Sequence, residues 1–460
     1  MVFSSLIFLF AYLTVTLALY YAVPLKWRNL VLFILSLVFY GWGEPKYIAL
    51  MLLSILSAYA FGFGIEHYRV KKPPVAKLFL GISVGINLSF LLFFKYFNFF
   101  AQTVGANPIQ DLTLPVGISF YTFQIMSYSI DLYRGDVPLA KKIVPFGTYV
   151  TLFPQLIAGP IVRYKDVCDQ LRVRRETVSK FASGVTRFVV GLGKKLILGD
   201  AAAALAERLQ TSAEFSPTAL GAWLIVLCYS FHIYFDFSGY SDMAIGLGRM
   251  FGFEFVENFN YPYIARSISD FWRRWHITLS TWFKEYVYIP LGGNRVGKLR
   301  GFCNLAVVWF LTGFWHGADW NYMLWGLYFW LFLVLEKAFL GKILNKNRPL
   351  SHLYALLVIG FGWLIFFNDL EALTTTAGHL VGVNAVFADG SVLHLLLRML
   401  PFLLICALAC TPLPKQLLAK AKDRLPCVEV LLSVGTMLLF LLCVAYMVDN
   451  SFSPFLYYIF

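Results

Sequence analysis

The sequence predicts an all-α integral membrane protein, a polytopic bundle of about 10–12 transmembrane helices. Of its 460 residues, 59% are hydrophobic and only 14% are charged, whereas about 25% of residues are charged in an ordinary soluble domain. The apolar residues also occur in blocks of about 20, the length that crosses the hydrocarbon core of a bilayer. These observations exclude soluble enzymes, secreted disulfide scaffolds and disordered chains.

The range in the number of helices arises because several apolar segments are shorter than a full span. The segments lie at 4–24, 29–43, 47–65, 78–98, 115–130, 217–236, 239–252, 303–317, 321–338, 352–368, 392–411 and 428–447. No internal repeat and no long Pro/Gly/Ser linker separates them. We therefore predict a single domain over 1–460, with a motif-rich core at about 105–340.

The charged residues indicate which loops face the cytoplasm. The formal net charge is +13, and such an excess of Lys and Arg usually lies in cytoplasmic loops. The loops at 337–348 and 415–424 are basic, whereas 369–391 contains acidic residues and neither Lys nor Arg. Segment 369–391 should therefore lie outside. No basic run is interleaved with aromatic residues in a soluble domain, so the bilayer is expected as a partner and nucleic acid is not.

Residues 163–200 differ from the other segments. Apolar residues recur at three- and four-residue steps from Val178 to Leu196, and basic residues line much of the remaining surface. This pattern predicts a basic amphipathic helix on the cytoplasmic surface of the membrane. A solvated connector helix is the alternative.

Three apolar stretches contain polar residues at membrane depth, which marks a candidate functional site. Segment 114–135 is predicted to be a helix whose polar side chains either face a wet cavity or form hydrogen bonds with neighbouring helices. Prolines break segment 153–163, which predicts a re-entrant segment or a kinked span. Segment 234–252 contains Asp236 and Asp242, which belong either to a site or to structural pairs with arginines.

The strongest candidate for chemistry is His316. An apolar helix that begins at Cys303 places it roughly 20 Å along the axis, inside the bilayer. A neutral imidazole there can take up a proton and return it, whereas a satisfied core histidine is the alternative. A second histidine, His276, lies in a basic, aromatic segment. The sequence has no HExxH, Walker or GxGxxG motif, so neither a zinc site nor an ATPase or dinucleotide enzyme is expected.

These stretches resemble the membrane-bound O-acyltransferase (MBOAT) family, and more closely its bacterial alginate O-acetylase branch. The matching segments are LPVGISFYTFQIMSYSIDLYRGD, LFPQLIAGPIVRY, YFDFSGYSDMAIGLGRMFGF, FWRRWHITLSTWFKEYVYIPLGGNR and LTGFWHGADWNYMLWG. The resemblance begins at MVFSSLIFLF and covers the chain up to about Phe367. It implies a ring of tilted spans and re-entrant segments around a central tunnel, in the bacterial cytoplasmic (inner) membrane.

The resemblance also implies a reaction. The family's WHG histidine is His316 here, and the histidine of its WHxTLSxW pattern is His276. An acetyl group would move from a cytoplasmic thioester, acetyl-CoA, to an extracytoplasmic polysaccharide. His316 would be the general base, and His276 would orient the acceptor or stabilise charge. Acetyl-CoA is then a substrate, and no bound cofactor or metal is implied.

Further residues are assigned around this centre. The phosphates of coenzyme A would be bound by three cations, Arg273, Arg274 and Lys284. The alternative is that these cations anchor a cytoplasmic loop at the membrane surface. The substrate tunnel would be lined by Trp275, Trp315, Gln155, Asp236 and Tyr240.

Several functions stay open at this point. An extracytoplasmic acetyl-transfer protein could relay the group to alginate, cellulose, peptidoglycan or another cell-surface glycan. A D-alanyl transferase of teichoic acids has the same architecture. A transporter or a scaffold of a polysaccharide-export complex would also contain polar groups at mid-membrane, but a transporter would predict repeat symmetry.

Overall fold

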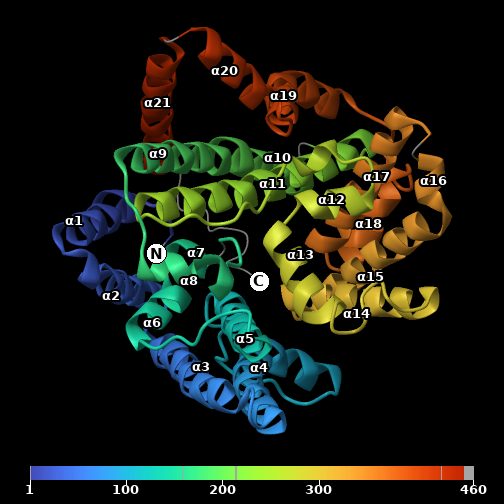
Figure 1. The fold of residues 1–460 in the computed structure, drawn as a ribbon. Coiled ribbons are helices and arrows are strands. Elements are labelled where there is room, and N and C mark those ends of the chain that lie inside the picture. The colour runs from blue at the N-terminus through green and yellow to red at the C-terminus, as the bar shows by residue number, and fades with distance from the viewer. Residues whose placement is uncertain (1, 158, 213–214, 345, 426, 450–460) are drawn as a thin grey trace. The chain divides into compact units, whose positions relative to one another are not determined.

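The computed structural model describes residues 2–157, 159–212, 215–344, 346–425 and 427–449. In these residues the chain consists of helices and their connecting loops, with one isolated β-bridge between Thr218 and Val386 (Figure 1). The predicted all-helical class is confirmed.

Within the described ranges, seven helices are long and apolar enough to cross a membrane. They are Pro45–Tyr68, Pro73–Thr103, Ala219–Met250, Trp320–Leu344, Arg348–Phe367, Gly390–Ala409 and Cys427–Asp449. A shorter apolar helix covers Ile7–Ala22. The protein is therefore polytopic.

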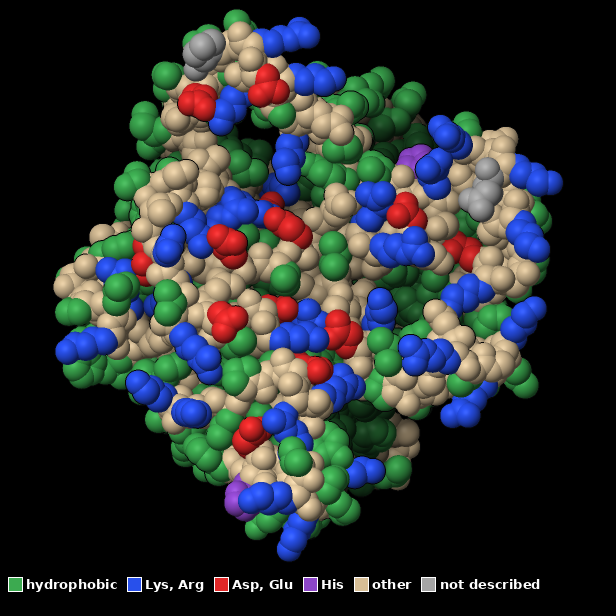
Figure 2. Space-filling view, in the orientation of Figure 1, with side chains coloured by type: hydrophobic (Ala, Val, Ile, Leu, Met, Phe, Trp, Pro, Cys, Tyr) green, Lys and Arg blue, Asp and Glu red, His purple; other side chains and the backbone are tan. Residues whose placement is uncertain are grey.

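The long apolar helices expose large hydrophobic side chains. In the helix Cys427–Asp449, for example, Val430, Leu438 and Leu441 are each more than half exposed. Figure 2 shows such side chains on the surface of the molecule, together with lysine and arginine side chains. Exposure of an apolar surface of this extent to water is unfavourable, whereas contact with the hydrocarbon core of a bilayer is not.

The contacts of the described residues cluster into two units. Unit 1 comprises the residues up to Val189 together with Tyr240–Glu257, and unit 2 comprises Val190–Gly239 and the described residues from Asn258 onward. The chain passes from one unit to the other within α9 (Val178–Gly193), within α11 (Ala219–Met250), and again between Glu257 and Asn258. The single domain over 1–460 stays a prediction.

Unit 1 is built on a pair of long helices, α3 (Ile48–Tyr68) and α4 (Pro73–Thr103), and α5 (Ile118–Arg134) packs against both. Its other helices are η1 (Ile7–Leu13), α1 (Thr14–Ala22), α2 (Leu25–Gly43), η2 (Pro45–Tyr47), α6 (Ile143–Thr151), α7 (Phe153–Leu156) and α8 (Tyr164–Arg172). The helix break predicted at 153–163 is present, because α6 ends before Pro154 and the next described helix, α7, has four residues.

Unit 2 contains both His276 and His316. Its helices are η3 (Lys194–Gly199), α10 (Asp200–Thr211), η4 (Pro262–Ile264), α12 (Ile268–Arg274), α13 (Ile277–Phe283), η5 (Lys284–Tyr288), α14 (Lys298–His316), α15 (Trp320–Leu335), η6 (Glu336–Leu340), α16 (Gly341–Leu344), α17 (Arg348–Phe367), α18 (Leu370–Leu380), α19 (Gly390–Ala409), α20 (Leu413–Arg424) and α21 (Cys427–Asp449). Three of them begin at aspartates, because Asp319, Asp369 and Asp389 accept backbone N–H groups at the starts of α15, α18 and α19.

The segment predicted to lie on the membrane surface contains α8 and α9, and α9 continues through the π-helical η3 into α10. Lys195 in η3 is only 1% exposed, and its Nζ lies 2.7 Å from Oδ1 of Asp200. The same Nζ lies 3.8 Å from Oδ1 of Asp236 on α11. One end of this segment is therefore held by a buried ion cluster. Its position relative to a membrane stays a prediction.

Glycines allow α14 and α15 to pack closely (Figure 1). A Cβ atom on Gly313 would collide with the carbonyl oxygen of Tyr322, and one on Gly326 would collide with that of Trp309. Backbone atoms cannot rotate away from such a contact as a side chain can. The two glycines therefore set the distance between the helix that ends at His316 and its neighbour.

We expect Gly326→Ala to lower the free energy of unfolding by about 1–3 kcal/mol, because the helices must separate to admit the methyl group. The thermal unfolding midpoint of the protein in detergent measures this loss. Gly85→Ala on α4 is the matched control, because its Cβ would enter open space. Equal midpoints for the two variants would contradict the role of Gly326 in packing.

Candidate functional site

The two histidines predicted from the sequence both lie buried in unit 2. His316 is the last residue of α14 and is 4% exposed, and His276 lies between α12 and α13 and is 1% exposed. The sequence folds in this way because Gly317 follows His316 with an extended backbone that ends the helix. A side chain at position 317 would collide with the ring of Tyr322.

Aromatic rings surround the imidazole of His316. The ring centroids of Trp315, Trp325 and Phe366 lie 5.0, 5.1 and 5.4 Å from it. The rings of Trp325 and Phe366 are both nearly perpendicular to the imidazole, at 84°. These apolar rings limit the access of water to the imidazole, which is 4% exposed.

Trp315 connects the two histidines. Its ring centroid lies 5.0 Å from that of His316 and 6.2 Å from that of His276. The two imidazoles are therefore no farther apart than the sum of these distances. Both imidazoles therefore lie beside the same tryptophan ring.

The backbone of His276 is left-handed, with φ 44° and ψ 53°. This conformation costs an L-residue about 1–2 kcal/mol, although histidine adopts it more readily than bulky or branched residues do. Nδ1 of His276 lies 3.1 Å from Oδ1 of Asn258, and the ring of Phe237 meets the imidazole edge to face at 4.7 Å. The side chain is thus held on two sides.

Burial lowers the pKa of the His276 imidazole to about 3, because removal of water disfavours the charged form. His276 is therefore neutral at physiological pH. A neutral imidazole can accept a hydrogen bond from a hydroxyl group, which a cation cannot do.

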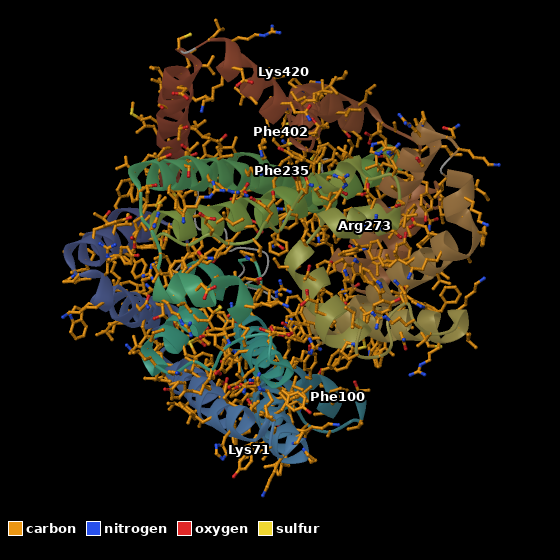
Figure 3. All side chains as sticks on the ribbon, in the orientation of Figure 1. Lys71, Phe100, Phe235, Arg273, Phe402 and Lys420 are labelled. Atoms are coloured by element: carbon orange, nitrogen blue, oxygen red, sulfur yellow. The ribbon has the colours of Figure 1, made fainter. Side chains whose placement is uncertain are left out.

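The three predicted phosphate-binding residues lie close together along the chain and differ in their surroundings. Arg273 on α12 (Figure 3) and Lys284 at the start of η5 are exposed. Arg274 is partly buried, and its guanidinium donates to the carboxylate of Asp270 at 3.1 Å and to the carbonyl oxygen of Asn260 at 3.2 Å. Arg273 and Lys284 are therefore the more accessible cations.

The residues predicted to line a tunnel fall into different surroundings. Trp315 contacts both histidines, and Trp275 packs against Trp363, with ring centroids 4.7 Å apart. Asp236 belongs to the ion cluster of Lys195. Gln155 and Tyr240 both lie in unit 1. There the side-chain amide of Gln155 donates to the carbonyl oxygen of Tyr149, and Tyr240 stacks on Phe3.

The carboxylates of segment 234–252 have basic partners. Asp242 pairs with Arg187 at 2.7 Å within unit 1, as the structural interpretation of this segment predicts. Asp236 pairs instead with a lysine. Among the described residues, no group of three or more His, Cys, Asp or Glu side chains is placed to hold a metal ion.

Sequence comparison identifies the family of the chain. A profile described as MBOAT, membrane-bound O-acyltransferase family, matches residues 140–366, which include both histidines. The chain is also 39% identical to the probable alginate O-acetylase AlgI of Pseudomonas putida, over 100% of both sequences. The chain belongs to the membrane-bound O-acyltransferase family. This membership makes it an acyltransferase, in agreement with the prediction from its motifs.

Other relatives of this MBOAT protein have related names. The probable alginate O-acetylase AlgI of Pseudomonas aeruginosa is 45% identical over 80% of this chain and 72% of its own length. A peptidoglycan O-acetyltransferase of Helicobacter pylori is 34% identical over 84% of this chain and 81% of its own length. A teichoic acid D-alanyltransferase of Bacillus subtilis is 30% identical over 51% of this chain.

Proposed function

We propose that this MBOAT protein resides in the bacterial inner membrane and transfers an acetyl group from cytoplasmic acetyl-CoA to a hydroxyl group of an extracytoplasmic polysaccharide. The observation that carries the proposal is the pair of buried histidines, both in contact with Trp315. The names of relatives that act on alginate and peptidoglycan support a polysaccharide as the acceptor.

His316 acts as the general base. Its imidazole takes the proton of the acceptor hydroxyl while the hydroxyl oxygen attacks the carbonyl carbon of the thioester. The carbon–sulfur bond then breaks, and the imidazolium returns the proton to the departing thiolate. The products are an oxygen ester and a free thiol, and His316 is neutral again.

His276 orients the acceptor. Because its imidazole is buried and neutral, it accepts a hydrogen bond from a neighbouring donor group of the acceptor and thereby aligns the attacking hydroxyl, whose own proton goes to His316. The aromatic side chains around His316 keep water away from the thioester, so transfer competes well with hydrolysis.

The exposed cations Arg273 and Lys284 attract the phosphates of coenzyme A at the cytoplasmic side. On the opposite side, the first acceptor hydroxyl belongs either to the polysaccharide or to an extracytoplasmic protein that relays the acetyl group to it. Both routes use the same chemistry at His316.

Inverted membrane vesicles test the donor. We expect acetyl-labelled coenzyme A to yield labelled, hydroxylamine-sensitive esters only when the donor can reach the cytoplasmic face. Right-side-out vesicles with external donor are the control. Labelling from a D-alanyl carrier protein in place of acetyl-CoA would favour the D-alanyl transferase, and an absence of ester from either donor would favour a scaffold or transporter.

A further inference from the structure

We propose that Asn258 is a positioning residue that holds His276 in the tautomer with its proton on Nδ1. This inference rests on the proposed function, in which His276 presents a lone pair to the acceptor. Asn258 lies 18 positions before His276 in the chain and is 1% exposed. It therefore acts from inside the protein, behind the imidazole.

Oδ1 of Asn258 is the meeting point of three hydrogen bonds. It accepts from Oγ1 of Thr278 at 2.9 Å and from the backbone N–H of Thr278 at 3.3 Å. Nδ1 of His276 lies 3.1 Å from the same oxygen. All three groups belong to the first turn of α13 and the residue before it.

The backbone N–H of Thr278 determines the direction of these bonds. A backbone amide can only donate, so the side-chain atom of Asn258 that faces it must be the oxygen and not the nitrogen. An amide oxygen can only accept, so Nδ1 of His276 must carry the proton. In the neutral ring, Nε2 then carries the lone pair.

The backbone fixes the position of Asn258 as well. The carbonyl oxygen of Asn258 accepts from the N–H of Ile277 at 3.0 Å, and two residues later the N–H of Asn260 donates to the carbonyl oxygen of Arg274 at 2.9 Å. The segment that carries Asn258 is therefore bonded to the chain on both sides of His276. A change of the Asn258 side chain alone leaves these backbone bonds in place.

The tautomer matters for the proposed reaction. With the proton on Nδ1, Nε2 accepts a hydrogen bond from a donor group of the acceptor that neighbours the attacking hydroxyl. The other tautomer would present an N–H at this position and could not accept that bond, as happens when the partner of a catalytic histidine is replaced in serine proteases. Asn258 thus acts through His276 and does not contact the substrate.

The tautomer can be observed without any assay of acyl transfer. We expect nitrogen NMR of histidine-labelled protein in nanodiscs to show a protonated Nδ1 for His276, with His276→Asn to assign the signal. Asn258→Ala should convert this signal to a mixture of tautomers. Asn87→Ala removes a buried amide in unit 1 and should leave the signal unchanged. An unaltered tautomer in Asn258→Ala would overturn the proposal.

Acyl transfer provides the second readout. We expect Asn258→Ala to lower ester formation at least about tenfold. Asn258→Asp keeps the acceptor oxygen but adds a negative charge that stabilises the imidazolium, so its activity should be retained at alkaline pH and lost below neutral pH, where the wild type still works. A uniform loss at every pH would indicate a structural role and overturn the proposal.

These measurements separate the two proposals. If wild-type protein transfers no acyl group but shows the Asn258-dependent tautomer, the proposed function fails and the role of Asn258 in fixing the imidazole stands. If transfer is normal and Asn258→Ala alters the tautomer without lowering ester formation, the positioning role in the reaction fails and the proposed function stands.

Discussion

Replacement of His316 by alanine is expected to lower the O-acetyl ester content of surface polysaccharide at least about 100-fold. The variant lacks the base that removes the hydroxyl proton, and the aromatic rings around position 316 contain no other group of suitable basicity. The measurement is the ester content of polymer from cells with equal amounts of wild-type or variant protein in their membranes.

His379→Ala is the matched control, because His379 lies partly exposed on α18 and has no part in the proposed reaction. Its ester content should equal that of the wild type. Full esterification in His316→Ala would rule out His316 as the base and favour a scaffold or transporter in which this residue is structural.

Lys195→Met should produce the largest loss of stability. Lys195 is 1% exposed, and its ammonium group lies close to the carboxylates of Asp200 and Asp236. Removal of the cation leaves two acidic groups near each other with little access to water, which costs about 3–5 kcal/mol for a broken buried pair. The thermal unfolding midpoint in detergent and the yield of folded protein measure the effect.

The double variant Lys195→Met/Asp200→Asn is the control for this interpretation. Removal of one carboxylate together with the cation relieves most of the unbalanced charge, so the double variant should recover a large part of the lost stability. A double variant that is less stable than Lys195→Met would show that packing, and not charge, accounts for the effect.

The membrane class and both histidines could be predicted from local patterns in the sequence. Apolar segments of spanning length are visible without any tertiary contact, and Gly317 marks the end of the helix that carries His316. The chemistry at His316 depends on residues adjacent in the chain, such as Trp315. Residues that are adjacent in the chain can be recognised together from the sequence, without knowledge of the tertiary structure.

Contacts between distant residues could not be predicted in this way. Asn258 lies in an irregular segment without periodicity, so nothing in the sequence connects it to His276. A continued α-helical period over 163–200 predicts that Lys195 lies on the basic side of the amphipathic helix. The π-helical η3 changes that period, and the structure buries Lys195 beside Asp236.

The left-handed backbone of His276 has a consequence for mutagenesis. Asparagine and glycine occupy this region of φ/ψ space with little strain, whereas valine and isoleucine resist it. A β-branched replacement would therefore alter the connection between α12 and α13 as well as remove the imidazole. Asparagine is the substitution at position 276 whose effect on activity can be attributed to the lost ring alone.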